Sequence, residues 1–137
     1  MIVKVTKEKK KYFKDLREIF KIDYLNELEK NPFYNIIVYV DEKKPKAYLS
    51  YNYLYDRYEI VNFEVIDEYR NLGIGSKLLL YLIALGEKEL IKNISLEVKI
   101  NSRACDLYRR HGFVDRAIRK AYYDGIDAIL MEKEMMK

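Results

Sequence analysis

The first part of the chain alternates between strand-like and helix-like spacing of hydrophobic positions. Val3 and Val5 are separated by a polar residue, which is typical of a short strand. Hydrophobic residues then recur every three or four positions over residues 12–20 and again over residues 24–28. This spacing predicts two short helices. The second should end before Pro32, because the residue that precedes a proline disfavours helical geometry.

Three dense runs of β-forming residues follow, over residues 36–40, 47–55 and 58–66. Polar, turn-forming segments at residues 41–45 and 56–57 separate these runs. Because short turns join neighbouring strands, the three runs predict an antiparallel meander in the middle of the chain.

In the second half of the chain, strands alternate with helices. The elements after the meander are a helix at 74–89, a strand at 94–99, a helix at 101–111, and strands at 113–121 and 126–134. Asn101 suits the N-cap of the second of these helices, and Gly112 suits the position that closes it. The complete order is β-α-α-β-β-β-α-β-α-β-β. It predicts an α/β (α+β) fold with a mixed, mostly antiparallel sheet of about seven strands and about four flanking helices.

The length of 137 residues fits a single domain over residues 1–137. Half of the residues are hydrophobic and 35% are charged, and no hydrophobic run approaches the ~20 residues that span a bilayer. We therefore expect no membrane association, and cytoplasmic residence, because no signal-peptide pattern follows Met1. A single cysteine and a single histidine exclude an internal disulfide and a multi-histidine zinc site, so we expect no metal.

A net charge of +4 favours an anionic ligand, such as a phosphorylated cofactor, and does not require nucleic acid. Arg109 and Arg110 are expected on a solvated helix surface. The matching feature is the turn Arg70-Asn71-Leu72-Gly73-Ile74-Gly75 between a strand-like and a helix-like run. Backbone N–H groups at residues 71–76 would face an anion there, and the helix dipole favours negative charge. An ordinary strand-to-helix turn is the alternative.

Three segments resemble the GNAT superfamily of acetyltransferases. Arg70-x-x-Gly73-x-Gly75 resembles the family's acetyl-CoA pyrophosphate loop. The second segment is Leu96-Glu97-Val98, followed by Asn101-x-x-Ala104-x-x-Leu107-Tyr108 and Gly112-Phe113. The third, Tyr122-Tyr123-Asp124-Gly125-Ile126-Asp127-Ala128-Ile129-Leu130-Met131, resembles the end of the Nα-acetyltransferases of protein N-termini, among them the ribosomal-protein alanine and archaeal enzymes. The resemblance covers residues 58–134 and implies a GNAT-like fold.

The resemblance implies a cofactor site around the glycine turn. The pyrophosphate of acetyl-CoA would be held by Arg70, Asn71, Leu72, Gly73, Ile74, Gly75 and Ser76. The backbone of Phe63 and Val65 would pair with the pantetheine arm, and the Val65 N–H would donate to the thioester oxygen. Asn101 would hydrogen-bond the arm, and Tyr108 would contact the cofactor and protonate the departing thiolate. Packing is the alternative for Tyr108, because the chain has 14 tyrosines.

By the same resemblance, the general base is a glutamate. Glu97 matches the catalytic glutamate of the ribosomal-protein enzymes, and Glu59 matches a glutamate that histone-type relatives place early in the strand before the loop. A third acidic residue, Glu64, should lie on the opposite face of that strand from Glu59, because strand side chains alternate. A chain of waters without one dominant base is a further alternative. An α-amino group has a pKa of about 7.7–8.0, so a weak base suffices.

Tyr122 and Tyr123, placed after the sixth strand, would line the substrate groove and hydrogen-bond a peptide backbone; a buried aromatic pair is the alternative. We therefore expect an acyltransferase that moves an acetyl group from acetyl-CoA directly to a primary amine. The first candidate acceptor is the α-amino group of a protein N-terminus, such as that of a ribosomal protein. The alternatives are a small-molecule N-acetyltransferase for polyamines or amino sugars, and a non-catalytic acyl-CoA-binding module.

Overall fold

The computed structural model describes residues 1–135, apart from the side chain of Tyr123. The strands are β1 (Ile2–Lys4), β2 (Tyr34–Asp41), β3 (Lys44–Leu54), β4 (Arg57–Val65), β5 (Asn93–Lys99), β6 (Val114–Tyr123) and β7 (Ile126–Glu134). The helices are α1 (Phe13–Phe20), α2 (Tyr24–Lys30), α3 (Ile74–Lys88) and α4 (Arg103–Arg110), with short 3-10 turns η1 (Lys10–Tyr12) and η2 (Asp67–Tyr69). The predicted order of elements and the mixed α/β fold are confirmed.

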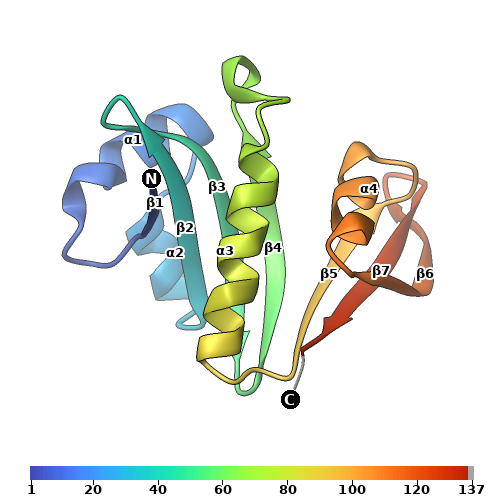
Figure 1. Ribbon diagram of the computed structural model, residues 1–137. Helices are drawn as coiled ribbons and strands as arrows, with labels where there is room; N and C mark the ends of the chain where they lie inside the picture. Colours follow the sequence, from blue (N-terminus) through green and yellow to red (C-terminus); the bar gives the residue numbers. More distant parts are fainter. Residues whose placement is uncertain (136–137) are drawn as a thin grey trace.

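The strands form one sheet in the order β1-β2-β3-β4-β5-β7-β6. Neighbouring strands are antiparallel except β4 and β5, which flank helix α3 in the chain. Their parallel pairing is short, and it runs only from Arg57 with Asn93 to Glu59 with Ser95. Beyond Glu59 the two strands part, and Figure 1 shows them diverging from a shared base. We call this opening in the middle of the sheet the fork.

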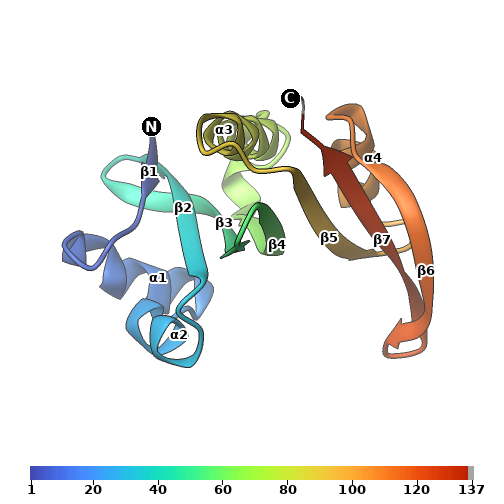
Figure 2. The ribbon, with the colours of Figure 1, turned by 90° about the horizontal axis from the view of Figure 1, so that it is seen from below.

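Helices cover both faces of the sheet. Figure 2 shows α1 and α2 on one face, and α3 and α4 on the other. The fully buried Leu16 of α1 packs in one core with Ile36 of β2, whereas Leu78 and Leu82 of α3 pack in a second core with Ile94 of β5. We call these the α1/α2 face and the α3/α4 face. The central strands are therefore buried on both sides.

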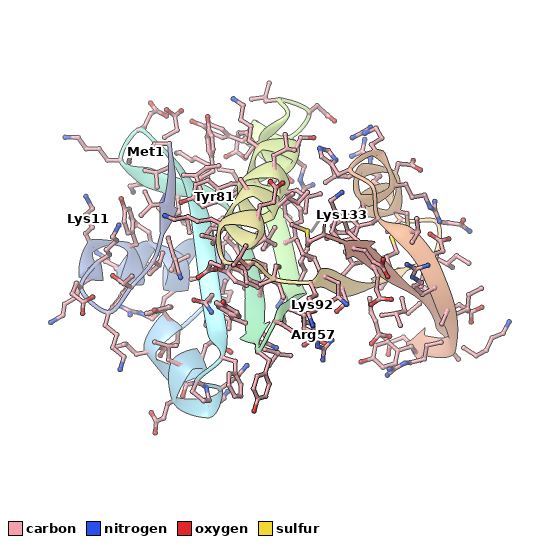
Figure 3. All side chains as sticks on the ribbon, turned by 60° about the horizontal axis from the view of Figure 1, so that its bottom comes forward. Met1, Lys11, Arg57, Tyr81, Lys92 and Lys133 are labelled. Carbon is pink, nitrogen blue, oxygen red and sulfur yellow. The ribbon has the colours of Figure 1, made fainter. Side chains whose placement is uncertain are left out.

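Charged side chains surround this layered interior. Figure 3 shows Lys11 and Lys92 projecting outward, whereas the space between helices and sheet is filled by side chains. None of the helices within residues 1–135 is long and apolar enough to cross a membrane.

Helix α4 begins later than the sequence predicts. Its first residue is Arg103 and its N-cap is Ser102, so the prediction of Asn101 as the N-cap is wrong. Asn101 adopts a left-handed conformation, with a φ of 63°, in the turn after β5. An N-cap requires extended backbone, whereas asparagine tolerates the left-handed region better than most residues. Gly112, with a φ of 91°, lies just beyond the end of α4 as predicted.

Two hairpin turns are tighter than the sequence predicts. Glu42 and Lys43 alone form the turn between β2 and β3, with φ values of 52° and 66°. The last turn includes Gly125, with a φ of 86°, so Tyr122 and Tyr123 are the final residues of β6 and not part of the turn. Two-residue turns with positive φ match the right-handed twist of the strands they join, which explains the short loops.

Candidate active site

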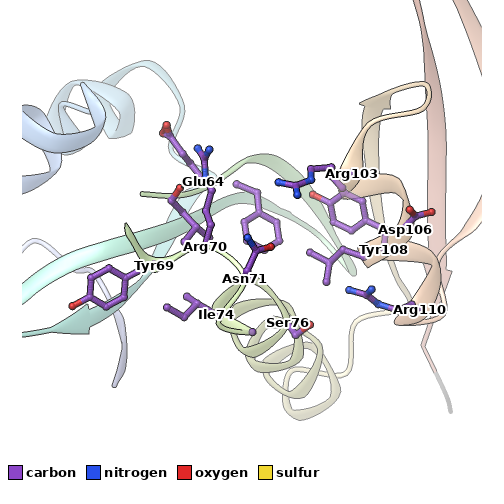
Figure 4. Close-up of a pocket in the computed structure, with 16 residues that line it drawn as sticks. Glu64, Tyr69, Arg70, Asn71, Ile74, Ser76, Arg103, Asp106, Tyr108 and Arg110 are labelled. Carbon is purple, nitrogen blue, oxygen red and sulfur yellow. Dashed lines mark hydrogen bonds between the residues drawn. The ribbon is translucent and has the colours of Figure 1, made fainter. Parts of the chain in front are cut away.

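A cavity of about 590 Å³ opens on the α3/α4 face of the fork, between the end of β4 and helix α4. The start of α3 forms its base, as Figure 4 shows in close-up. The cavity is lined by Phe63, Glu64, Val65, Tyr69, Arg70, Asn71, Gly73, Ile74, Gly75, Ser76, Arg103, Ala104, Asp106, Leu107, Tyr108 and Arg110. Every residue that the sequence assigns to cofactor binding is among them except Leu72 and Asn101, both of which are exposed.

The base of the cavity contains backbone N–H groups that have no partner within helix α3. Gly73 is the N-cap of this helix, and no side chain caps it. The Lys77 N–H donates to the Gly73 carbonyl at 3.1 Å, so the N–H groups of residues 74–76 precede the helical ladder. Asn71 and Gly73 have positive φ values of 62° and 78°, a backbone pattern typical of anion-binding loops. With the helix dipole, this arrangement favours a phosphate.

The two glycines of the turn are required for different reasons. A side chain at Gly73 would meet nothing within 4 Å, so the φ of 78° alone explains the glycine there. A Cβ atom at Gly75 would lie 3.4 Å from Leu107 Cδ2 and 3.5 Å from Phe63 Cζ, which both line the cavity. A larger side chain at Gly75 would therefore fill the space between β4, α3 and α4.

The second half of β4 presents a free edge to this cavity. After the fork begins, residue 60 and residues 62–65 pair with β3 on one side, and no described strand pairs with the other. The Ile66 N–H donates to β3 at 3.0 Å, so by alternation the N–H groups of Phe63 and Val65 point to the open edge. The Val65 carbonyl lies on the same edge and accepts a hydrogen bond from Arg70 Nε at 3.0 Å. Arg70 thereby joins the glycine turn to the end of β4.

Tyr108 stands on the α4 wall of the cavity. The residue is only 4% exposed, and its ring centroid lies 6.2 Å from that of Phe63 and 5.5 Å from that of Phe113. This aromatic packing holds the ring in place. Figure 4 shows its hydroxyl directed into the cavity. Tyr108 therefore belongs to the core and also presents a proton-bearing oxygen to the cavity.

A second, smaller pocket of about 130 Å³ lies on the α1/α2 face of the fork. It is lined by Ile22, Glu27, Asn31, Tyr34, Asn52, Val61 and Asn62. A β-bulge in β4 contributes to it, because Ser50 pairs with Asn62 and Tyr51 pairs with Ile60, which leaves Val61 as an extra residue. Bulges bend a strand and redirect side chains, and they are frequent next to active sites.

The bulge overturns the prediction that Glu64 and Glu59 lie on opposite faces of β4. Glu59 pairs with Asn52 and Glu64 pairs with Tyr48, and these two partners share one face of β3. One extra residue inverts the alternation beyond it, so Glu64 joins Glu59 on the α1/α2 face. Burial, and then the charge of Glu64, raise the pKa of Tyr48 to about 12, which agrees with this position.

A chain of side-chain amides holds Glu59. The Phe33 N–H donates to Asn31 Oδ1 at 3.0 Å, and Asn31 Nδ2 donates to Asn52 Oδ1 at 2.7 Å. Asn52 Nδ2 then donates to Glu59 Oε1 at 3.1 Å. Because a backbone N–H can only donate, it sets the direction of every bond in the chain. Glu59 therefore accepts a hydrogen bond at Oε1, and its Oε2 takes no part in this series of hydrogen bonds.

Glu97 lies across the fork on β5. Ser95 pairs with Glu59, and Glu97 is two residues further on, so both glutamates share the α1/α2 face. Arg119 of β6 forms an ion pair with Glu97, with 3.2 Å between Nε and Oε2, and 26% of the Glu97 side chain is exposed. Glu97 is therefore a partnered group beside the fork rather than an isolated charge on an exposed sheet face.

The end of β6 places an aromatic ring beside this ion pair. The Arg119 guanidinium lies 4.4 Å from the centre of the Tyr122 ring. Tyr122 is 48% exposed, so a buried position, the alternative for this residue, does not apply to it. The side chain of Tyr123, which the sequence assigns to the same groove, lies outside the described part of the chain.

Residues 3–113 match the sequence model of the acetyltransferase (GNAT) family. This chain belongs to the GNAT family. Its sheet, its glycine turn and the fork are therefore parts of a GNAT acetyltransferase, and the predicted enzyme class, an acyltransferase that uses acetyl-CoA, is confirmed.

Several relatives of this GNAT protein are recognisable along most of its length. A protein of Bacillus subtilis (strain 168), named for alanine N-acetylation of ribosomal protein bS18, is 30% identical over 114 residues, which cover 81% of this chain and 76% of the relative. An N-alpha-acetyltransferase of Sulfurisphaera tokodaii is 29% identical over 85% of this chain and 86% of the relative. The crystal structure of the ribosomal-protein-S18-alanine N-acetyltransferase of Escherichia coli has a TM-score of 0.82 and 24% identity, covers 100% of this chain and 95% of its own, and shows the shared fold.

Gly75, at the base of the cavity, offers a test of whether acetyl-CoA binds there. We expect Gly75→Val to lower the affinity for acetyl-CoA about tenfold, a loss of about 1.4 kcal/mol, because the valine methyl groups would occupy the arm's space. Gly75→Ala is the matched control, since its single methyl makes ordinary contacts with Leu107 and Phe63. Titration calorimetry with acetyl-CoA measures both variants. Equal affinities in the wild type and Gly75→Val would show that the ligand does not approach this residue.

Sequence reasoning missed part of the α4 wall. Arg103, Leu107 and Arg110 are spaced by four and three residues, so they share one helix face, and all three line the cavity. The motif itself contains the signal for them. Leu107 belongs to it, so residues three or four positions away on the same helix face can be predicted to line the same site. The predicted solvated positions of Arg109 and Arg110 are confirmed, since both are exposed, but Arg110 also lines the cavity. Arg109 does not line the cavity; it pairs with Asp115 instead, with 2.9 Å between Nη2 and Oδ2.

Proposed function

We propose that this enzyme transfers an acetyl group from acetyl-CoA to the α-amino group of a protein N-terminus. The fork between β4 and β5 carries the proposal. On its α3/α4 face lie the glycine turn, whose N–H groups favour a phosphate, and the free edge of β4. On its α1/α2 face lie the smaller pocket, Glu59 and Glu97. Donor and acceptor can approach one point from opposite faces, and positioning of this kind supplies much of an enzyme's rate. The names of the B. subtilis and S. tokodaii relatives support a protein N-terminus as acceptor.

On the donor side, the N–H groups of residues 71–76 bind the pyrophosphate, and the open edge of β4 pairs with the pantetheine arm as an added strand does. The Val65 N–H donates to the thioester oxygen as that oxygen gains negative charge. The amine attacks the carbonyl carbon, the C–S bond breaks, and Tyr108 protonates the departing thiolate. Asn101, which is exposed in the turn before α4, would hydrogen-bond the arm from outside the lining of the cavity.

On the acceptor side, the attacking amine must lose a proton to the protein. An α-amino group has a pKa of about 7.7–8.0, so a carboxylate is a sufficient base. We propose Glu97 for this role, because it matches the catalytic glutamate of the resembling enzymes and lies on the α1/α2 face of β5, where Arg119 pairs with it. Glu59 is the competing base, because the amide chain orients its carboxylate toward one partner and leaves Oε2 for another.

A peptide acetylation assay tests this function. Incubation with acetyl-CoA and peptides that have free N-termini should release the CoA thiol and place the acetyl group on the α-amino nitrogen. Peptides that begin with alanine are the first choice, following the name of the B. subtilis relative. The matched control is the same peptide with a blocked N-terminus and an internal lysine. It should give no product, because the lysine amine, with a pKa of about 10.4, stays protonated at neutral pH. Mass spectrometry locates the acetyl group.

A small-molecule amine is the second candidate acceptor. The observation that favours it is the pocket on the α1/α2 face, which is only about 130 Å³ and includes the carboxylate of Glu27 among its lining residues. Thiol release with polyamines or amino sugars, and with none of the peptides, would assign the enzyme to this class. Binding of acetyl-CoA without thiol release in either series would identify a non-catalytic acyl-CoA-binding module.

A further inference from the structure

Helix α4 presents two arginines to the donor cavity at opposite ends of one helix face. Arg103 is the first residue of α4 and Arg110 is the last, and both line the cavity. Their Cα atoms are separated by seven residues, or about 10.5 Å along a helix axis. Figure 4 shows both side chains extending from α4 over the cavity, on the side that faces Asn71 and Ser76.

Within residues 1–135, neither Arg103 nor Arg110 forms an ion pair, whereas Arg109 and Arg70 do. Arg109 pairs with Asp115 at 2.9 Å and also approaches Asp106 at 3.9 Å. On the opposite wall, Arg70 pairs with Asp67 at 2.7 Å. The α4 wall therefore offers two guanidinium groups whose charge no described carboxylate neutralises.

The pyrophosphate does not need these two cations, because the N–H groups at the start of α3 and the helix dipole already favour it. Coenzyme A carries a further phosphate, the monoester on the 3′-oxygen of its ribose. A phosphate monoester carries a charge of about −1.5 to −2 at neutral pH. Guanidinium groups suit such a group, since their paired N–H donors match the geometry of phosphate oxygens.

We propose that Arg103 and Arg110 together bind the 3′-phosphate of coenzyme A and make the enzyme select CoA thioesters over their 3′-dephospho counterparts. The inference rests on the use of acetyl-CoA in the proposed function and is independent of the acceptor. The two side chains project from one helix face over the cavity, and their long stems allow both guanidinium groups to turn toward one phosphate there. Asp106, which also lines the cavity, leaves this charge in place because its partner is Arg109.

Binding of two ligands that differ only in the 3′-phosphate tests the inference. Titration calorimetry with CoA and with 3′-dephospho-CoA is carried out on the wild type, on the double variant Arg103→Gln/Arg110→Gln, and on Arg109→Gln. The double variant should bind CoA at least tenfold more weakly, with 3′-dephospho-CoA changed by less than about twofold, since a charge-assisted hydrogen bond acts only when both groups are present. Arg109→Gln lies on the same helix but outside the cavity, so it should keep the wild-type preference for CoA.

The contrary outcomes are distinct. Equal weakening of both ligands in the double variant, or weakening of neither, would overturn the inference, provided that circular dichroism shows the variant folded. Arg103→Lys/Arg110→Lys separates charge from loss of packing, because lysine retains the charge on a long stem and should recover part of the preference for CoA. A wild-type protein that binds neither ligand would overturn the donor assignment and this inference with it. Binding with the expected preference but no acetylation of any amine would contradict only the proposed function.

Discussion

The Tyr108→Phe variant should lower kcat by about two orders of magnitude, the lower end of the roughly 10²–10⁴-fold that a positioned general acid contributes to a rate. The phenylalanine ring keeps the packing against Phe63 and Phe113, so only the hydroxyl that faces the cavity is lost. The affinity for acetyl-CoA should therefore stay within about twofold of the wild type, since the loss is confined to the transition state. Steady-state kinetics at saturating acceptor, together with titration calorimetry, measure the two quantities.

Tyr69→Phe is the matched control for this experiment. Tyr69 lines the same cavity, but its hydroxyl donates to Asp41 Oδ2 at 2.6 Å, and Figure 4 shows the ring turned away from Tyr108. Its replacement should leave kcat within about twofold of the wild type. An unchanged kcat in Tyr108→Phe would remove Tyr108 from the acid role. Equal losses in both variants would point instead to a general disturbance of the cavity.

Glu97→Gln should lower kcat/KM by about two orders of magnitude at neutral pH, the usual contribution of a general base. Glutamine keeps the shape of the side chain, and its carbonyl oxygen can still accept from Arg119, so the change removes the proton acceptor while preserving the contact. The loss should shrink above about pH 8, because the α-amino group of the acceptor is then deprotonated without help. Measurement of kcat/KM between about pH 6 and 10 provides the test.

Glu59→Gln is the comparison that assigns the base. Its carbonyl oxygen can still accept from Asn52, so the amide chain remains intact. If Glu97 is the base, the loss in Glu59→Gln should stay below about tenfold at every pH. The reverse order of losses would transfer the role to Glu59. Small losses in both variants would favour a chain of waters without one dominant base.

The types and order of the elements followed from local patterns in the sequence. The strand, the glycine turn and helix α3 could be placed because hydrophobic spacing and the conformational freedom of Gly73 depend on residues a few positions apart. The same reasoning failed at the start of α4, where Asn101 suits an N-cap equally well as a residue type. The left-handed turn after β5 moved the N-cap to Ser102.

The candidate site was less predictable on its acceptor side than on its donor side. On the donor side, residues close together around the glycine turn and in the α4 motif suffice to outline the cavity, and the missed Arg103 and Arg110 lie about one helical turn from Leu107. On the acceptor side, the groups that meet come from distant segments. Nothing in the residues around Glu97 indicates that Arg119 will pair with it.

Local sequence patterns were sufficient to predict the order of strands and helices, the glycine turn before α3, and the family to which the motifs belong, because each depends on residues that are close in the chain. The common face of Glu59, Glu64 and Glu97 could be recognised only in the folded protein. That arrangement depends on the bulge at Val61 and on strand register. Pairing between strands sets both the bulge and the register, and an ion pair joins residues that are far apart in the chain. None of these features can therefore be predicted from a single segment of sequence.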